Sequence, residues 1–224
     1  MHTLFRAVLF DMDGVLYNSM YLHAKAWHKS MSKFGIEMAE EEAFLLEGMR
    51  GFDIVRMKMR EQQGKNLSEE EARKIYDYKS ELVFTFGKVD KMEGVEQLMQ
   101  QFHDDGLRIG VVTGSGQRTL FERLSQDFPG LISAENIVTS YDVEQGKPFP
   151  DPYIKGMERV ESTPAETLVV ENAPLGVKSA KAAGCYTLAV NTGPLQPDVL
   201  QAAGANEVFA DMHEALLWWK NREH

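Results

Sequence analysis

The stretch AVLFDMDGVLYN, residues 7–18, joins a short apolar run to two acidic side chains that stand one residue apart. The run at residues 7–10 has no polar member, which is typical of a strand covered on both faces. Asp11 and Asp13 follow it, and Gly14 lets the chain turn sharply after them. Because neighbouring carboxylates repel each other, a cation is expected beside the pair. This stretch therefore predicts a buried strand that ends in a charged site.

The composition indicates a globular protein with an acidic surface. The chain has 224 residues, 43% of them hydrophobic and 26% charged, which allows one domain or two small ones. The formal net charge is −10 and the pI is about 5.1. Such a surface repels nucleic acid and anionic membranes, so we expect neither as a partner. An anionic substrate would need a local cation, either a metal ion or a placed lysine.

The cysteine content and the apolar runs indicate the compartment. A single cysteine, Cys185, excludes an internal disulfide and fits a reducing environment. No apolar run approaches the roughly 18 residues of a membrane-spanning helix, and the N-terminal residues lack the layout of a signal peptide. We therefore expect a cytoplasmic protein, and we expect it to be a monomer.

Short apolar runs recur along the chain, separated by segments with helical patterns. The runs are rich in Val, Ile, Leu and Thr and do not alternate with polar residues, which favours strands covered on both faces. Repeated strand–helix units predict an α/β fold with a doubly wound, parallel, Rossmann-like sheet. In such a sheet the ligand lies beyond the carboxyl ends of the strands. The runs are residues 7–10, 107–113, 135–140, 167–172, 185–191 and 207–210.

The segment after the first strand has a different pattern. From about residue 18 to residue 86 only helical periodicity is found, and Ser68 with Glu71 forms a capping box at the start of one helix. This predicts an all-helical domain inserted over the strand ends. We expect residues 1–17 and 90–224 to form the α/β core domain and residues 18–89 to form a helical cap domain.

Four motifs lie at or just after predicted strand ends. Taken singly, each has an ordinary explanation as a turn, a solvated loop or a helix cap. Their order and their common place at strand ends favour one shared site. They are DMDG (11–14), VVTGSG (111–116), GKPFPDPY (146–153) and VVENAPLG (169–176).

This set of motifs resembles that of the haloacid dehalogenase superfamily of phosphotransferases. The helical insertion resembles the C1-type cap of its β-phosphoglucomutase-like group, and the similarity covers essentially the whole chain. The segments SMYLHAKAW (19–27) and LLEGMRG (45–51), together with VVTGSGQ and VVENAPLGV, look most like a branch that hydrolyses inorganic pyrophosphate. The resemblance implies a Mg²⁺-dependent hydrolase that forms an aspartyl phosphate with a small phosphorylated substrate.

The resemblance also implies a role for each residue of the motifs. Asp11 is expected to attack phosphorus, and Asp13 to protonate the leaving oxygen and later to activate water. Lys147 is expected to bridge the phosphate and Asp11 and to cancel the developing charge. The residues expected to hold phosphate oxygens are Thr113, Gly114 and Ser115.

The implied Mg²⁺ ligands are oxygen atoms, as this ion prefers. They are the Asp11 carboxylate, the Asp13 backbone carbonyl and the Asn172 side chain, with Glu171 acting through a water. Many relatives carry Asp where this chain has Asn172. Asn keeps a ligand oxygen but removes one negative charge, so we expect weaker or altered Mg²⁺ binding, with a lost metal site as the alternative.

The inserted helices should select the substrate, and we expect substrate contacts from His23, Glu47, Arg50 and Tyr76. His23 matches by spacing a histidine of the mutase cap, with a packing role as the alternative. The mutase holds a distal phosphate with an Arg and a Lys of its cap. Counting residues from the first motif places these positions near Gly51 and Tyr76 in this chain, and Arg50 is next to the first of them. Glu47 either gates small substrates, contacts a metal, or is a solvated helix-end residue.

Four functions stay open from the sequence. Hydrolysis of inorganic pyrophosphate is the preferred one, because an acid near a distal phosphate does not suit a sugar bisphosphate. A β-phosphoglucomutase or a sugar-phosphate phosphatase is the enzyme alternative. A non-catalytic binding protein on the same fold is disfavoured, because Asp11, Asp13 and Lys147 are all present.

Overall fold

The computed structural model describes residues 5–116 and 119–222, with residues 119–121 described by their backbone alone. Within these residues, a six-stranded sheet has the order β3-β2-β1-β4-β5-β6, and every neighbouring pair is parallel. This confirms the predicted α/β fold with a doubly wound sheet. The strands are β1 (Ala7–Phe10), β2 (Arg108–Val112), β3 (Ile137–Val138), β4 (Thr167–Glu171), β5 (Tyr186–Val190) and β6 (Glu207–Phe209).

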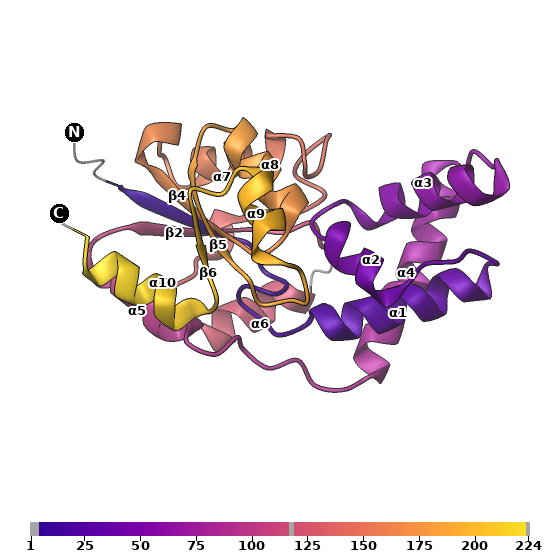
Figure 1. Ribbon diagram of the computed structural model, residues 1–224, viewed down its shortest axis with the longest axis horizontal. Helices are drawn as coiled ribbons and strands as arrows, with labels where there is room; N and C mark the ends of the chain where they lie inside the picture. The colour runs from indigo at the N-terminus through magenta and orange to yellow at the C-terminus, as the bar shows by residue number, and fades with distance from the viewer. Residues whose placement is uncertain (1–4, 117–118, 223–224) are drawn as a thin grey trace.

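Helices cover both faces of the sheet (Figure 1). Along β1 the side chains alternate between the faces: Val8 and Phe10 join the apolar cluster under one set of helices, and Ala7 and Leu9 join the cluster under the other. This double burial explains why the strand sequence has no polar alternation. The first set is α5 (Val95–Asp104), α6 (Thr119–Asp127) and α10 (Met212–Lys220); the second is α7 (Asp151–Arg159), α8 (Pro174–Ala182) and α9 (Pro197–Ala203).

Between β1 and α5 the chain forms helices that pack on one another at the end of the molecule opposite its two termini (Figure 1). Their shared apolar cluster includes Trp27, Met31, Phe52 and Ile75. The capping box forms as expected, since Ser68 N–H donates to Glu71 Oε2 at 2.8 Å and Glu71 N–H donates to Ser68 Oγ at 3.3 Å. The helices are α1 (Met20–Lys33), α2 (Glu40–Leu45), α3 (Gly51–Gln63) and α4 (Glu69–Thr85).

The chain leaves the sheet and returns to it through two segments that lie side by side. Asn18 N–H donates to the carbonyl of Asp90 at 2.9 Å, and Met92 N–H donates to the carbonyl of Leu16 at 2.9 Å. We propose that these segments join two domains at the boundaries given above. None of the helices in the described residues has the length and apolar composition needed to cross a membrane.

Candidate active site

Strand register brings the acidic and hydroxyl side chains to one edge of the sheet. Phe10 of β1 lies opposite Val111 of β2 and Val170 of β4. Asp11 and Glu171 come directly after Phe10 and Val170, and Thr113 comes two residues after Val111. The three side chains therefore come together at the carboxyl edge, although they are far apart in the sequence. All three are buried. This arrangement places the three strand ends close together, as expected for a shared site.

Lys147 lies between two of these carboxylates and is only 1% exposed. Its Nζ contacts Asp11 Oδ1, donates to Glu171 Oε1 at 2.6 Å and donates to the Val112 carbonyl at 3.2 Å. Burial alone would lower the pKa of Lys147, but the two carboxylates outweigh it and raise that pKa above its ordinary value. Burial raises the pKa of Asp11 to about 8, although Lys147 acts in the opposite direction. A further cation beside Asp11 would favour the ionised carboxylate.

Glu171 is fully buried and accepts four hydrogen bonds. Lys147 Nζ and the Tyr153 hydroxyl donate to Oε1 at 2.6 and 2.7 Å, while the backbone N–H groups of Asn172 and Ala173 donate to Oε2 at 2.9 and 3.1 Å. A Cβ at position 176 would lie 1.7 Å from Glu171 Oε1, so this close approach requires Gly176. These donors occupy both oxygens of the Glu171 carboxylate. The expected contact of Glu171 with Mg²⁺ through a water stays a prediction.

Asp13 is held by residues of the helical insertion and the segment leading into it. Ser19 Oγ donates to Asp13 Oδ1 at 2.6 Å, and His23 Nε2 lies 3.4 Å from the same oxygen. Burial favours a higher pKa for Asp13, but His23, Ser19 and Lys79 outweigh it and lower the pKa to about 2. Burial, assisted by Lys79, lowers the pKa of His23 below its usual value. A neutral His23 can donate to Asp13 while its Nδ1 accepts from Lys79 Nζ at 2.6 Å.

Lys79 is a site residue that the sequence analysis missed. It lies on α4 one turn after Tyr76, is only 3% exposed, and lines the same pocket as Asp11 and His23. The available signal was a lysine inside the apolar stripe of that helix, beside Ile75, Leu82 and Val83. The resemblance to the mutase cap places a lysine near position 76. This chain has Tyr76 there, and its lysine lies three residues later on the same helix, at position 79.

Glu47, in the loop after α2, also lies in the site and is 7% exposed. The Asn172 Nδ2 group donates to both of its carboxylate oxygens, at 3.0 and 3.1 Å. Burial, together with the charge of Asp11, raises the pKa of Glu47 well above its usual value. Glu47 is therefore not a solvated helix-end residue, and it places a further carboxylate next to Asp11.

The oxygen atoms around Asp11 fit a hard divalent cation. Asn172 Oδ1 is buried and has no hydrogen-bond partner among the described residues. Residues 5–116 and 119–222 hold no group of three His, Cys, Asp or Glu side chains suited to a metal. At this site residue 172 is an amide, and Glu171 faces Lys147. A magnesium site here would therefore combine the Asp11 carboxylate with the Asn172 amide oxygen and the Asp13 carbonyl, and Glu47 lies close enough to contribute.

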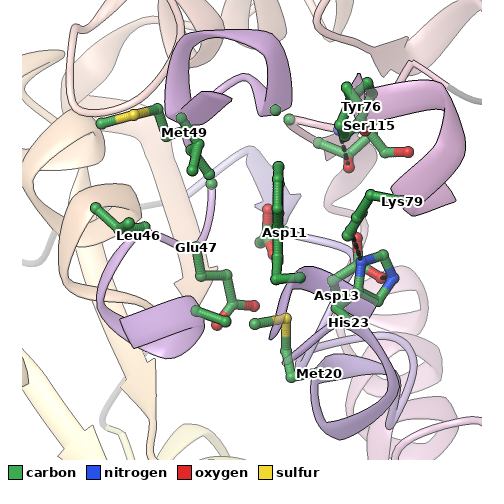
Figure 2. Close-up of a pocket in the computed structure, with 17 residues that line it drawn as sticks. Asp11, Asp13, Met20, His23, Leu46, Glu47, Met49, Tyr76, Lys79 and Ser115 are labelled. Atoms are coloured by element: carbon green, nitrogen blue, oxygen red, sulfur yellow. Dashed lines mark hydrogen bonds and ion pairs between the residues drawn. The ribbon is translucent and has the colours of Figure 1, made fainter. Parts of the chain in front are cut away.

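The cavity between the strand ends and the inserted helices measures about 60 Å³. Figure 2 shows Glu47 on one side of Asp11, with His23 and Lys79 on the other. Gly48 closes over the loop of residues 113–115, because a Cβ at Gly114 would lie 2.7 Å from the Gly48 carbonyl oxygen. The predicted site residues that line the cavity are Asp11, Asp13, His23, Glu47, Tyr76, Thr113, Gly114 and Ser115.

Arg50 is the predicted substrate contact that the structure does not bring into this cavity. Its Nε donates to Asp53 Oδ2 at 2.6 Å, and its guanidinium lies 4.8 Å from the ring centre of Phe52. The neighbouring position is filled instead by the ring of Tyr76, which a Cβ at Gly51 would approach to 2.0 Å. An ion pair and a ring contact hold Arg50 away from the cavity in this conformation, and its contact with substrate stays a prediction.

Lys79→Met is expected to stabilise the protein at pH 7 by about 1 to 3 kcal/mol. Burial lowers the pKa of Lys79 from 10.5 to about 8, so its charged form is disfavoured in the folded state. This cost is full below pH 8 and disappears as the pH rises toward the unfolded value of 10.5.

Urea unfolding of both proteins at pH 7 and pH 9.5 measures this effect, and the stability gain of the variant should shrink at the higher pH. Lys74→Met, on the exposed face of the same helix, is the control and should change little. A variant that is less stable than the wild type at pH 7, or a gain that does not depend on pH, would contradict this account of Lys79.

Comparison with known proteins gives the family. The model of the haloacid dehalogenase-like hydrolases matches residues 8–190. Hexitol phosphatase A of Escherichia coli K12 is 31% identical over 186 residues, covering 83% of each chain. A candidate pyrophosphatase of Caldanaerobacter subterraneus subsp. tengcongensis is 28% identical over 217 residues, covering 94% of this chain and 92% of the relative.

A solved structure points the same way. A candidate β-phosphoglucomutase from Bacteroides vulgatus matches with a TM-score of 0.93 and 42% identity, covering 97% of this chain and 88% of that one. These relatives confirm the resemblance to phosphatases and phosphomutases, and they leave the substrate open. The chain belongs to the haloacid dehalogenase-like hydrolases and is an enzyme of their phosphatase and phosphomutase kind.

Proposed function

We propose that this enzyme is a Mg²⁺-dependent inorganic pyrophosphatase that acts through an aspartyl phosphate on Asp11. The observation that carries the substrate is the buried Glu47 carboxylate, hydrogen-bonded to Asn172 beside Asp11 in a cavity of about 60 Å³. A small, highly charged substrate that binds together with a metal ion suits these surroundings better than a sugar phosphate does.

The residues that would hold Mg²⁺ are Asp11, the carbonyl of Asp13 and Asn172, with Glu47 as a further carboxylate nearby. When bound, the ion would offset the negative charge of the carboxylates and of the transferred phosphoryl group. The unpaired oxygen of Asn172 supports this assignment, because a buried acceptor without a partner is costly unless a ligand uses it.

The chain's own residues can carry out both halves of the reaction. Asp13 has a pKa of about 2 in the structure, so it must first take up a proton from solvent, which the negative charge of the bound substrate favours. An Asp11 oxygen then attacks phosphorus, the bond to the leaving phosphate breaks, and the Asp13 carboxyl gives that proton to the leaving oxygen. Water then attacks the aspartyl phosphate while Asp13 takes its proton, which releases orthophosphate and restores Asp11. Lys147, in contact with Asp11, lowers the cost of the negative charge throughout.

The two ends of pyrophosphate find different surroundings in the cavity. The transferred phosphoryl group would lie at Asp11 against the loop of residues 113–115, and the leaving phosphate would lie toward Lys79 and His23. Burial and the charge of Asp11 raise the pKa of Glu47, and a Mg²⁺ ion beside it would favour its ionised form. Ionised Glu47 opposes binding of an anion that brings no metal ion, because like charges in a buried space repel. A magnesium-bound pyrophosphate arrives with part of its charge already screened, so Glu47 favours it over metal-free esters.

A β-phosphoglucomutase is the second candidate, and one observation favours it. Lys79 supplies a buried cation in the pocket, where a sugar bisphosphate would need its distal phosphate held. Counting along the sequence placed Tyr76 where the mutase has this lysine, and Lys79 supplies the cation one turn later. The remaining arguments against it are the Glu47 carboxylate and the pairing of Arg50 with Asp53.

Glu47→Gln tests the substrate. In the wild type, kcat/KM for pyrophosphate should exceed that for β-glucose 1-phosphate and hexitol phosphates, and the variant should lose about tenfold or more for pyrophosphate because the charge opposite the metal is gone. Orthophosphate release and glucose 6-phosphate formation are measured in parallel with Mg²⁺. Glu41→Gln, at an exposed position of α2, is the matched control. Glucose 6-phosphate formation far above any hydrolysis would establish the mutase instead.

A further inference from the structure

We propose that Tyr153 is a positioning residue for Lys147, acting through Glu171. The inference rests on the role of Lys147 in the proposed function, but it does not depend on which phosphate compound is the substrate. The inference is based on the buried hydroxyl group of Tyr153, which donates to Glu171 Oε1 at 2.7 Å. The same oxygen accepts a hydrogen bond from Lys147 Nζ.

The geometry makes Lys147 a shared cation. Its Nζ contacts Asp11 on one side and Glu171 on the other, and its ammonium lies 5.1 Å from the ring centre of Tyr153. A buried lysine between two carboxylates moves toward whichever one attracts it more strongly. The position of its charge relative to Asp11 therefore depends on how much negative charge Glu171 presents.

Tyr153 reduces that competition. Its hydroxyl donates to the Glu171 oxygen that faces Lys147, and two backbone N–H groups donate to the other oxygen. With these donors in place, the Glu171 carboxylate is partly satisfied and holds Lys147 less tightly, so the lysine stays close to Asp11. Without the hydroxyl, Glu171 would draw Nζ toward itself, away from the oxygen atoms on which charge develops in the transition state.

The placement of Tyr153 supports a function beyond packing. Lys147 lies in the segment that leads into α7, Tyr153 lies in the first turn of α7, and Glu171 ends β4. The Tyr153 ring packs in the apolar cluster under α7 and α8, and a phenylalanine would fill the same space. The hydroxyl group is the part that packing does not require.

The test compares Tyr153→Phe with Tyr186→Phe. Tyr186 also donates its hydroxyl to a glutamate, Glu207 Oε1 at 3.0 Å, but it lies at the start of β5, away from the carboxyl edge of the sheet. Both variants lose one tyrosine–glutamate hydrogen bond. We expect kcat to fall about tenfold for Tyr153→Phe alone, since a hydrogen bond to a charged group carries an effect of this order. The KM for pyrophosphate and the Mg²⁺ concentration at half-maximal velocity should change less than twofold.

Three results would overturn the inference. Equal kcat values in the two variants would show that the hydroxyl only stabilises the fold. A loss of activity caused mainly by a higher KM would assign Tyr153 to substrate binding, and one caused by a higher Mg²⁺ requirement would assign it to the metal site. If the wild type does not hydrolyse pyrophosphate, the substrate proposal fails by itself. The comparison is then made with p-nitrophenyl phosphate and with calorimetric binding of orthovanadate in Mg²⁺, which should weaken in Tyr153→Phe and not in Tyr186→Phe.

Discussion

Replacing Asp11 by Asn is expected to lower turnover by on the order of 10³-fold or more, which is about 4 kcal/mol of transition-state stabilisation. The amide has nearly the shape of the carboxylate but cannot form the acyl phosphate. Lys147 keeps Glu171 as a partner in the variant, so the fold should survive. The loss should therefore appear in kcat and not in the thermal unfolding temperature.

Orthophosphate release and thermal unfolding are measured side by side for this variant. Asp104→Asn, at an exposed position on α5, is the control for the change from acid to amide and should retain full activity. If the Asp11 variant turns over at the wild-type rate, the aspartyl-phosphate route is wrong, whatever the substrate.

Lys147→Met is expected to lower the free energy of unfolding by about 3 to 5 kcal/mol, because removing one member of a buried ionic group leaves the others uncompensated. Asp11 and Glu171 would remain buried and close together without the cation that both contact. Two ionised carboxylates that are buried without a cation are unfavourable. Either they become protonated or the protein opens locally around them, and each of these lowers the free energy of unfolding. Activity should be lost as well.

Urea unfolding in the presence of a chelator measures this loss without compensation by a metal ion. Lys155→Met is the control, because Lys155 pairs with Glu158 on the surface of α7 at 2.7 Å, and exposed pairs contribute at most about 1 kcal/mol. A similar, small loss in both variants would show that Lys147 is not a structural partner of the two acids.

Much of the fold and of the core site could be predicted from local sequence. Residues 7–10 are apolar without alternation because both faces of β1 are covered, and that pattern by itself indicates a parallel, doubly covered strand. Asp11 and Thr113 directly follow such strands, and Glu171 is the last residue of another. Parallel strands present their carboxyl ends at one edge, so sequence position alone was enough to bring these residues together.

The residues that face the substrate from the inserted helices were decided by tertiary structure. Glu47 and Asn172 are 125 positions apart, and no local pattern indicates that the amide donates to this carboxylate and leaves its own oxygen free. The lysine expected at position 76 is found at position 79. Residues three or four apart lie on the same face of a helix, so a count that is wrong by one turn still identifies the correct face.

The directions in which the long side chains point could likewise not be predicted from the sequence. Arg50 turns to Asp53, and Glu171 turns to Lys147 and Tyr153, because buried charges take the partners that packing brings within reach. The sequence by itself determined which strands carry the chemical groups and at which edge they meet. Only the folded chain decided which cation each carboxylate receives, since that depends on contacts between segments that are remote in the sequence.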